Sequence, residues 1–314
     1  MEAVTLSAAI LRKGPAFKVL PPLSLYIHIP WCMRKCPYCD FNSHESRGAV
    51  PEAEYVDALV ADLEQALPLV WGRKVYTVFF GGGTPSVFSS AAIDRILSSV
   101  RARVPLAADA EITLEANPGT FEAAKFEAYR AAGVNRLSIG IQSFNPRHLT
   151  ALGRIHDDLQ ARGAIEIAQR YFDNFNLDLM FALPGQSPRE AQEDIEQALS
   201  FEPPHLSVYH LTIEPNTYFH RHPPVVPDDD AAAAMQDATE ALLEGAGYEH
   251  YETSAYARPG KRARHNLNYW CFGDYLGIGA GAHSKLSFPE RIVRQARYRQ
   301  PREYMERALH GAAV

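Results

Sequence analysis

Three cysteines, Cys32, Cys36 and Cys39, stand in a C-x3-C-x2-C spacing shortly after the strand-like run Leu25–Ile29. A loop that leaves a strand can bring such closely spaced thiols to one metal centre. Thiolates are soft ligands that select iron–sulfur clusters, zinc or copper(I). Because a stable tetrahedral zinc site takes four ligands and this loop offers three, we favour a [4Fe–4S] cluster with one iron open to a further ligand.

Two other interpretations of these cysteines stay open: buried structural thiols, or part of a zinc site in a non-redox binding protein. Arg34 and Lys35 lie between the thiols, and we expect their positive charge to lower the thiol pKa values. The remaining cysteine, Cys271, is distant in the sequence, and we expect it to be a packed thiol. Four cysteines, three of them within eight residues, make a poor disulfide framework. This usage suits the reducing environment of the cytosol.

A glycine-rich turn, Gly81–Pro85, follows the apolar run Val75–Phe80. Glycines let a backbone approach a ligand closely, and successive N–H groups form a polar nest. A turn of this kind is weak evidence by itself. Its combination with the cysteine loop makes a ligand-binding role specific.

Strand-like and helix-like stretches alternate along the chain, which indicates an α/β protein with a parallel sheet. We predict a partial parallel (β/α)6 barrel, with its site at the carboxyl ends of the strands. The expected strands are Leu25–Ile29, Val75–Phe80, Glu111–Glu115, Arg136–Ile141, Phe175–Met180 and Leu206–Leu211. The expected helices are Glu52–Leu67, Ser90–Val100, Phe121–Ala131, Asp157–Gln169, Pro188–Ser200 and Ala231–Ala246.

Four polar residues, Glu115, Gln142, Arg154 and Asp178, stand at or near the ends of the third, fourth and fifth expected strands. Each of them alone is compatible with a solvated position at the rim. Their shared placement favours ligand contact. Arginine binds carboxylates in bidentate geometry, and a carboxylate such as Asp178 suits ribose hydroxyls.

The pattern changes after Gly247 to aromatic and polar residues, so we divide the chain into an N-terminal arm (1–23), the barrel (24–247) and a C-terminal extension (248–314). In the extension, His265 precedes Tyr269 and Trp270. A neutral imidazole is a common axial heme ligand, and the two rings could pack on a porphyrin. The alternative is a hydrogen-bonded histidine beside an aromatic core.

Other residues of the extension are also candidates. A basic cluster upstream of His265 either pairs with porphyrin propionates or forms a solvated turn; it comprises Lys261, Arg262 and Arg264. The small-residue run Gly277–Ser284 predicts close backbone approach near the site, with His283 as a further ligand candidate. Pro301–Val314 begins a helical pattern without a clear cap, and we expect a C-terminal portion to be missing.

The bulk composition is that of a soluble globular protein, with 314 residues of which 46% are hydrophobic and 22% charged. The net charge of −6 argues against wholesale nucleic-acid binding. No apolar run approaches the roughly 20 residues that span a bilayer, and the N-terminus lacks the basic start of a signal peptide. We therefore expect a cytoplasmic protein.

Together these motifs resemble the oxygen-independent coproporphyrinogen III oxidase family of the radical S-adenosylmethionine (SAM) superfamily. The matching segments are Leu25–Cys32, Cys36–Asn42, Phe80–Pro85, Glu115–Pro118, Ser138–Phe144, Leu152–Arg154 and Asp178–Met180. The resemblance implies that Cys32, Cys36 and Cys39 hold a [4Fe–4S] cluster whose open iron chelates the amino and carboxylate groups of SAM. It also implies SAM contacts from Tyr26, Tyr38, Gly82, Gly83, Thr84, Glu115, Gln142, Arg154 and Asp178.

Within that family the chain resembles the heme-chaperone branch, HemW. The oxidase has a further cysteine where Phe41 stands here, and it carries a longer N-terminal extension. The run His265–Trp270 fits the branch's His-Asn-x-x-Tyr-Trp motif. This resemblance implies that the protein binds heme, with His265 as ligand, and transfers it to membrane respiratory proteins. It further implies a cytoplasmic protein or one peripheral at the inner membrane, and it leaves a homo-oligomer open. The alternative function is oxidative decarboxylation of coproporphyrinogen III.

Overall fold

The computed structural model describes residues 17–120 and 122–314. Most of the N-terminal arm (1–16), and Phe121 at the expected start of a helix, lie outside the described residues. The strands are β1 (Leu23–Ile29), β2 (Trp31–Cys32), β3 (His44–Glu45), β4 (Val75–Gly82), β5 (Leu106–Ala116), β6 (Arg136–Gln142), β7 (Phe175–Phe181), β8 (His205–His210), β9 (Glu249–Glu252), β10 (Ala255–Ala257), β11 (Asp274–Ile278), β12 (His283–Phe288) and β13 (Arg291–Ala296). The helices are α1 (Glu52–Val70), α2 (Ser90–Arg103), α3 (Ala123–Ala132), α4 (Pro146–Ala151), α5 (Asp158–Tyr171), α6 (Pro188–Leu199), α7 (Tyr218–Arg221), α8 (Asp229–Gly245), α9 (Arg264–Trp270) and α10 (Pro301–Leu309), with single 3-10 turns at η2 (Pro85–Val87) and η3 (Pro118–Thr120).

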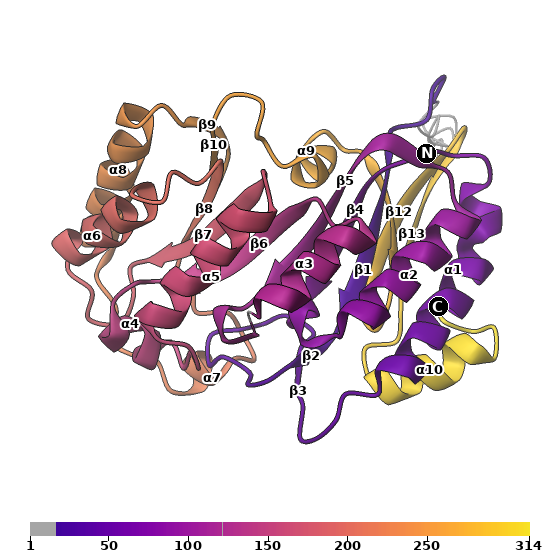
Figure 1. Ribbon diagram of the computed structural model, residues 1–314, viewed down its shortest axis with the longest axis horizontal. Helices are drawn as coiled ribbons and strands as arrows, with labels where there is room; N and C mark the ends of the chain where they lie inside the picture. The colour runs from indigo at the N-terminus through magenta and orange to yellow at the C-terminus, as the bar shows by residue number, and fades with distance from the viewer. Residues whose placement is uncertain (1–16, 121) are drawn as a thin grey trace, which may run out of the picture.

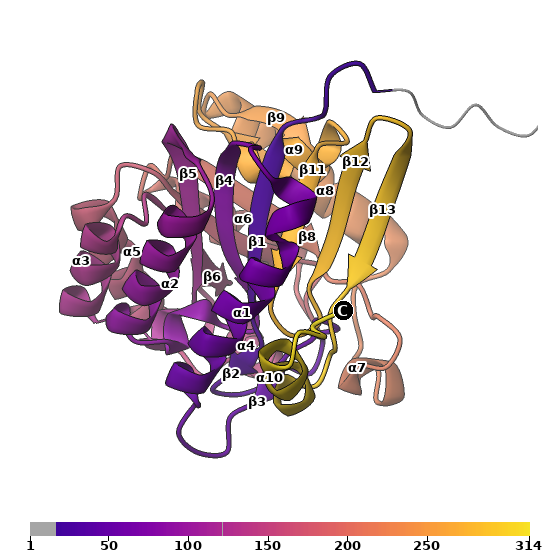
Figure 2. The same cartoon turned by 90° about the vertical axis from the view of Figure 1, so that its right-hand side faces the viewer.

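Eleven of the described strands form one sheet, in the order β13-β12-β11-β1-β4-β5-β6-β7-β8-β10-β9 (Figures 1 and 2). The central strands from β11 through β8 are parallel. The two ends are antiparallel, with β12 and β13 at one edge and β10 and β9 at the other. The predicted α/β fold with a mostly parallel, partial barrel is confirmed. The barrel gains one parallel strand, β11, from the C-terminal segment.

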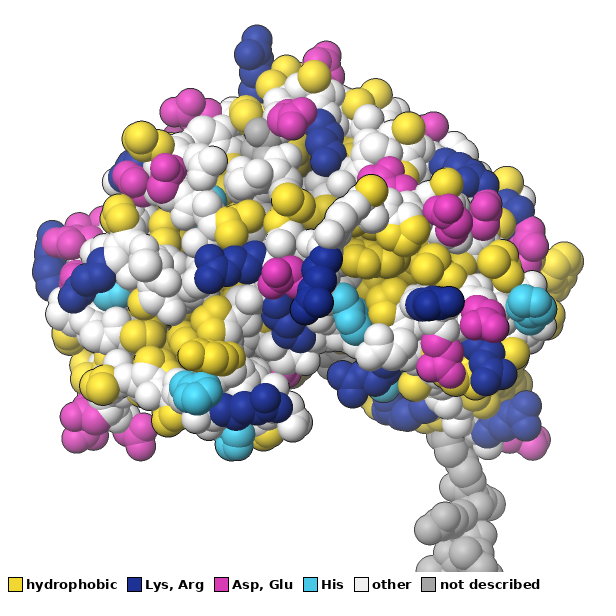
Figure 3. Space-filling view, turned by 90° about the horizontal axis from the view of Figure 1, so that it is seen from below, with side chains coloured by type: hydrophobic (Ala, Val, Ile, Leu, Met, Phe, Trp, Pro, Cys, Tyr) yellow, Lys and Arg dark blue, Asp and Glu magenta, His cyan; other side chains and the backbone are white. Residues whose placement is uncertain are grey.

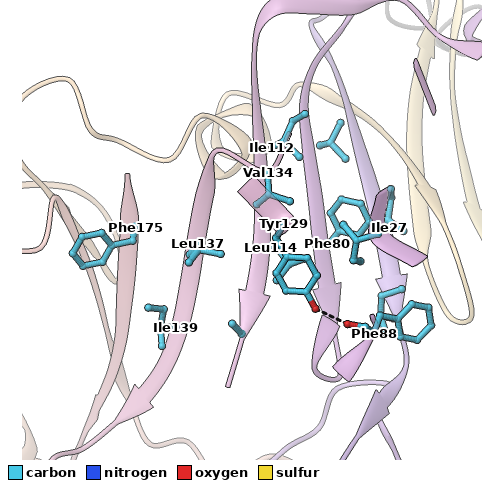
Figure 4. Close-up of a cluster of buried hydrophobic side chains, with 14 of the residues drawn as sticks. Ile27, Phe80, Phe88, Ile112, Leu114, Tyr129, Val134, Leu137, Ile139 and Phe175 are labelled. Atoms are coloured by element: carbon cyan, nitrogen blue, oxygen red, sulfur yellow. Dashed lines mark hydrogen bonds between the residues drawn. The ribbon is translucent and has the colours of Figure 1, made fainter. Parts of the chain in front are cut away.

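The main helices cover one face of the sheet, where neighbouring helices pack side by side (Figure 1). Apolar side chains fill the space between helices and strands (Figure 4). Tyr129 of α3 lies among them, and its hydroxyl donates a hydrogen bond to the carbonyl of Phe88. Side chains alternate along a strand, so burial of Ile27 in this core turns Tyr26 and His28 of β1 toward the opposite face. The core thereby orients the site.

Buried ion pairs hold the polar C-terminal strands in the sheet. Asp274 at the start of β11 pairs with Arg73 at 2.8 Å and with Lys285 of β12 at 2.9 Å. Asp62 of α1 pairs with Arg297, just beyond β13, at 3.1 Å. Removing one partner of such a pair typically costs about 3–5 kcal/mol. Strands β9–β13 were not predicted, because long-range pairs and neighbouring strands stabilise them and their own sequences carry little apolar alternation.

Short elements also occur in segments where the sequence predicts neither a helix nor a strand. They are β2, β3, α4, α7 and α9, and each is too short to show a reliable hydrophobic period. Among the described residues, no helix combines the length and the apolar character needed to cross a membrane.

Candidate cofactor site

The cysteine loop follows β1 and is tied back onto itself. Strands β2 and β3 pair at its base, and the N–H of Ser46 donates to the carbonyl of Cys32 at 2.9 Å. The ammonium of Lys35 donates to the carbonyls of Phe41 and Ser43 at 3.2 and 3.1 Å. These bonds fix the backbone path between the three thiols.

Hydrogen-bond donors accompany the two half-buried thiols. Ser43 Oγ lies 3.5 Å from Cys39 Sγ, and Arg154 Nη1 donates to Cys36 Sγ at 3.6 Å. Soft sulfur donors with a guanidinium and a hydroxyl beside them fit the thiolates of an iron–sulfur cluster. In the described part of the chain, no three His, Cys, Asp or Glu side chains converge on a single metal ion. Cluster thiolates bind separate iron atoms and do not need that convergence.

Cys32 is the most buried of the three thiols. Burial raises its pKa to about 11, and a hydrogen bond with Thr84 acts in the opposite direction. The Lys35 ammonium is engaged by backbone carbonyls. The expectation that Arg34 and Lys35 lower the thiol pKa values is therefore wrong for Cys32, where loss of hydration outweighs nearby charge. A metal that binds this sulfur has to displace its proton.

The glycine turn at the end of β4 packs directly against the cysteine loop. The N–H groups of Gly83 and Thr84 donate to carbonyls at the start of that loop, each at 2.8 Å, and the N–H of Gly82 donates to Glu115 Oε2 at 3.2 Å. The expected open nest of N–H donors is thus occupied by the protein itself. The glycines are required for close approach, because a Cβ on Gly82 would lie 2.5 Å from the His28 ring.

A cavity of about 500 Å³ opens beside this turn, on the sheet face opposite the main helices. Tyr26, His28, Gly82 and Glu115 line it from the neighbouring strands β1, β4 and β5, which we call one end of the cavity. Figure 3 views the molecule from below, where the outline is deeply indented and hydrophobic side chains gather with Lys, Arg and His side chains among them. The volume falls in the range of pockets that take small-molecule ligands.

The polar groups at this end of the cavity are neutral near pH 7. Burial, reinforced by the negative charge of Asp178, raises the pKa of Glu115 to about 8, so this carboxyl holds its proton. His28 Nε2 lies 2.9 Å from the carbonyl of Asn42, which can only accept, so Nε2 carries the ring proton. His28 Nδ1 then accepts from the Tyr26 hydroxyl at 3.0 Å. Burial lowers the pKa of His28.

Tyr38, Gln142 and Arg154 form a second group, next to Cys36. Arg154 Nη2 donates to the carbonyl of Gly140 at 2.7 Å while its Nη1 donates to the Cys36 thiol. Burial raises the pKa of Tyr38, and the adjacent guanidinium opposes that rise. Gln142 ends β6 in the left-handed region at φ 69°. A side chain on Gly140 would contact both Gln142 and Arg154, so the group is closely packed.

Asp178 lies on β7, among polar side chains of the same sheet face. It accepts hydrogen bonds from Ser138 Oγ at 3.1 Å and from Asn176 Nδ2 at 2.7 Å. Burial raises its pKa. The parallel strands therefore bring the predicted residues to one side of the sheet, but only Tyr26, Gly82 and Glu115 of the predicted SAM contacts line the cavity.

His265 is buried under the sheet face, with both ring nitrogens engaged. The Thr77 hydroxyl donates to Ser24, so His265 Nδ1 donates to Thr77 at 2.7 Å and Nε2 accepts from the Tyr269 hydroxyl at 3.1 Å. Burial lowers the pKa of His265 to about 3. Its backbone N–H donates to Glu111 at 3.0 Å, which holds the start of α9 on β5. Tyr269 lines the cavity, whereas His265 itself does not.

The basic residues just before His265 are engaged elsewhere. Lys261 donates to a backbone carbonyl at 3.2 Å, Arg262 pairs with Glu249 at 3.0 Å, and Arg264 pairs with Asp109 at 3.1 Å. This arrangement corresponds to the solvated basic turn, one of the two alternatives that the sequence left open.

Several cavity residues had been given no role from the sequence: His28, Asn42, Tyr275 and Arg299. Apolar residues alternate with other residues along β1. This alternation is the signal that places His28 on the same face of the strand as Tyr26. Asn42 Nδ2 donates to the carbonyls of Ala280 and Arg299, each at 2.9 Å. Nothing local in the sequence signals that contact, because more than two hundred residues separate Asn42 from each of the two carbonyls.

Comparison with known proteins places this architecture in a family. The family model described as the Radical SAM superfamily matches residues 26–198. A protein of Escherichia coli named heme chaperone HemW is 57% identical over 289 residues, which cover 91% of this chain and 76% of that protein. A Mycobacterium tuberculosis protein of the same name is 36% identical over 300 residues, covering 93% of this chain and 76% of that protein.

A solved structure with the same fold is the E. coli coproporphyrinogen III oxidase HemN, described as a radical SAM enzyme. Its TM-score is 0.82 at 27% identity, covering 94% of this chain and 71% of that chain. The predicted resemblance is thus confirmed at the level of family and fold, and the radical SAM family implies a [4Fe–4S] cluster and SAM. The matched sequence and the shared fold make this chain a member of the radical SAM superfamily and, within it, of the HemW heme-chaperone family.

Proposed function

We propose that this protein binds heme in the cavity beside the cysteine loop and transfers it to heme-requiring respiratory proteins. One observation carries the proposal beyond family membership. The cavity of about 500 Å³ has protonated or neutral polar groups at one end and a histidine and an arginine at the other. Such a pocket suits a large planar ligand that carries a metal and carboxylates.

Cys32, Cys36 and Cys39 are the residues that would hold the cluster. When bound, a [4Fe–4S] cluster with an open iron supplies a chelation site for the amino and carboxylate groups of SAM. Around it, Arg154 donates to the Cys36 sulfur and Ser43 lies beside Cys39, which stabilises thiolate charge.

The predicted SAM contacts divide into two sets. Tyr26, Gly82 and Glu115 line the cavity and can meet a bound molecule directly, with Glu115 as a hydrogen-bond donor in its protonated form. The other predicted contacts do not line the cavity, and we propose that they position the loops around SAM; they are Tyr38, Gly83, Thr84, Gln142, Arg154 and Asp178.

His265 stays the sequence-based candidate for a heme ligand. Its neutral imidazole is the ligating form, because burial lowers its pKa to about 3. Ligation at Nε2 requires that the Tyr269 hydroxyl, 3.1 Å away, move aside. Since Tyr269 borders the cavity, rotation of that one side chain would open a path between heme and His265.

We further propose that residues 248–314 supply the heme-facing part of the protein, that the acceptors are membrane respiratory proteins, and that transfer occurs at the inner membrane. Self-association is an additional proposal. It would be measured by sedimentation with and without the cluster.

Heme transfer is the direct test of this function. Cluster-loaded, heme-loaded protein is mixed with inner-membrane vesicles from heme-starved cells, and difference absorbance follows heme appearing in the membrane cytochromes. We expect transfer that is faster and more complete than from an equal amount of free heme. Transfer no better than that of free heme would contradict the proposal.

A further inference from the structure

The cavity has an end that none of the predicted SAM contacts lines and to which His265 does not extend. It is formed by Tyr275 of β11, the turn at Gly281, His283 at the start of β12, and Arg299 before α10. The His283 side chain is exposed and has no hydrogen-bonding or ionic partner among the described residues. One cavity is thus lined by a histidine without a side-chain partner, a tyrosine and an arginine.

The backbone that carries His283 is rigidly held. Just before it, the N–H of Gly279 donates to Asp62 Oδ2 at 3.2 Å, and the N–H of Ala280 donates to the Tyr55 hydroxyl at 2.8 Å. Both acceptors are buried side chains of α1. His283 itself is paired with β13 opposite Ala296. A metal-binding side chain is held in position more precisely on a strand and a buried turn than on a free loop.

Arg299 lies next to the same turn. The N–H of Gly281 donates to the carbonyl of Tyr298 at 2.8 Å, and Asn42 holds the carbonyl of Arg299 itself. The Arg299 side chain is exposed and has no ionic partner among the residues that the structure describes. An unpaired guanidinium at a cavity mouth suits a carboxylate, which it can bind in bidentate geometry.

We propose that His283 ligates the heme iron and that Arg299 binds a heme propionate, at the end of the cavity formed by β11, β12 and the segment before α10. This assignment rests on the proposed heme-binding function. It differs from ligation by His265, because His283 is accessible in the present conformation whereas both His265 nitrogens are engaged. Tyr275 contributes an aromatic wall for the macrocycle.

The test is an anaerobic heme titration, followed by absorbance, of the cluster-loaded wild type and of His283→Ala, His265→Ala and the control His310→Ala. His310 is exposed at the carboxyl end of α10 and does not line the cavity. We expect His283→Ala to weaken heme binding at least about tenfold, the scale of damage to a metal site. We expect Arg299→Gln to weaken it about threefold to fivefold, as for an exposed ion pair.

A ligand swap provides a second, spectroscopic readout. His283→Met keeps a side chain that can bind iron, and we expect it to bind heme with a shifted Soret band and an altered electron paramagnetic resonance signal. An unchanged heme spectrum in His283→Met, or heme binding lost in His265→Ala but retained in His283→Ala, would overturn the assignment. Absence of saturable heme binding in the wild type would instead overturn the proposed function, so the two failures are distinguishable.

Discussion

The two ends of the cavity are built in opposite ways. At the end near the glycine turn, the polar side chains are buried and bonded to one another: Glu115 to Gly82, and Tyr26 to His28 and onward to Asn42. At the other end, the side chains of His283 and Arg299 are exposed and have no hydrogen-bonding or ionic partner among the described residues. One end is thus preorganised and the other is open.

This difference matches the two kinds of ligand that we assign to the ends. A resident cofactor benefits from donors held in advance, because little ordering entropy is then lost on binding. A cargo has to leave again, so an accessible site with few fixed contacts suits it. Changes at the preorganised end should affect the cluster and SAM, whereas changes at the open end should affect heme alone.

The largest expected effect follows from removing a thiol of the cysteine loop, which packs against the glycine turn at the preorganised end. Cys36→Ser should lose the [4Fe–4S] cluster, because the hydroxyl is a poor substitute for a soft thiolate. Iron and acid-labile sulfide analysis after anaerobic reconstitution provides the measurement. Cys271 is exposed, so the expectation of a packed thiol is wrong. Because Cys271 is also distant in the sequence from the cysteine loop, Cys271→Ser is the control and should keep full iron. Full iron and sulfide in Cys36→Ser would rule out the assigned ligand.

The next effect concerns backbone approach at the glycine turn. Gly82→Ala places a Cβ about 2.5 Å from the His28 ring at a φ of +120°, and we expect a loss of about 1–3 kcal/mol in the free energy of unfolding together with weaker SAM binding. Gly72→Ala is the matched control, since Gly72 also has a positive φ (+73°) but open space around it. Denaturant unfolding and SAM calorimetry distinguish the two. Equal losses of stability and of SAM affinity in the two variants would show that the contact with His28 is not their cause.

A pH dependence tests the buried carboxyl. The pKa of Glu115 is raised to about 8 in the folded protein, above its unfolded value. The folded state therefore holds more protons between about pH 4.5 and 8, and this stabilisation is lost as the pH rises through that window, with a slope of at most about 1.4 kcal/mol per pH unit. Glu115→Gln should flatten the profile of unfolding free energy against pH. An identical profile in the variant would show that Glu115 is not the titrating group.

The smallest effect is expected at Tyr269. Tyr269→Phe removes the hydrogen bond to His265 Nε2, at a cost of about 1 kcal/mol in stability. If His283 is the heme ligand, heme affinity should stay within about twofold of wild type. A marked gain in heme affinity, with a changed heme spectrum, would indicate that His265 ligates the heme iron once Tyr269 no longer bonds to it. The assignment of heme to the open end would then be wrong.

The preorganised end was largely predictable from the sequence. Its signals are local in the sequence: the cysteine spacing, the glycine turn and the apolar runs at Val75–Phe80 and Arg136–Ile141. Because the strands are parallel, residues at their carboxyl ends come together at one edge of the sheet. The expected start of the helix at Asp157 agrees with the structure, where Asp157 caps α5 in a capping box with Gln160. The local pKa expectations failed at Cys32, because burial is a property of the fold and charge spacing cannot report it.

The open end was harder to predict because long-range pairs build it. Asp62 and Arg297 pair although they are 235 positions apart, and the buried ammonium of Lys285 is paired with Asp274 and donates to the carbonyl of Phe272. In isolation those residues look like surface charges. His283 was noted from its small-residue context, but its exposure in the cavity and the neighbouring Arg299 depend on the pairing of β11, β12 and β13.

One measurement tests the central claim most directly. Cluster-loaded wild-type protein is titrated anaerobically with heme, and a second portion of the same sample is incubated with SAM, a reductant and coproporphyrinogen III. The account predicts saturable heme binding, with a defined Soret band, and no decarboxylation of the porphyrinogen. Absence of saturable heme binding, together with formation of carbon dioxide and 5′-deoxyadenosine, would contradict it and assign the protein to the oxidase reaction.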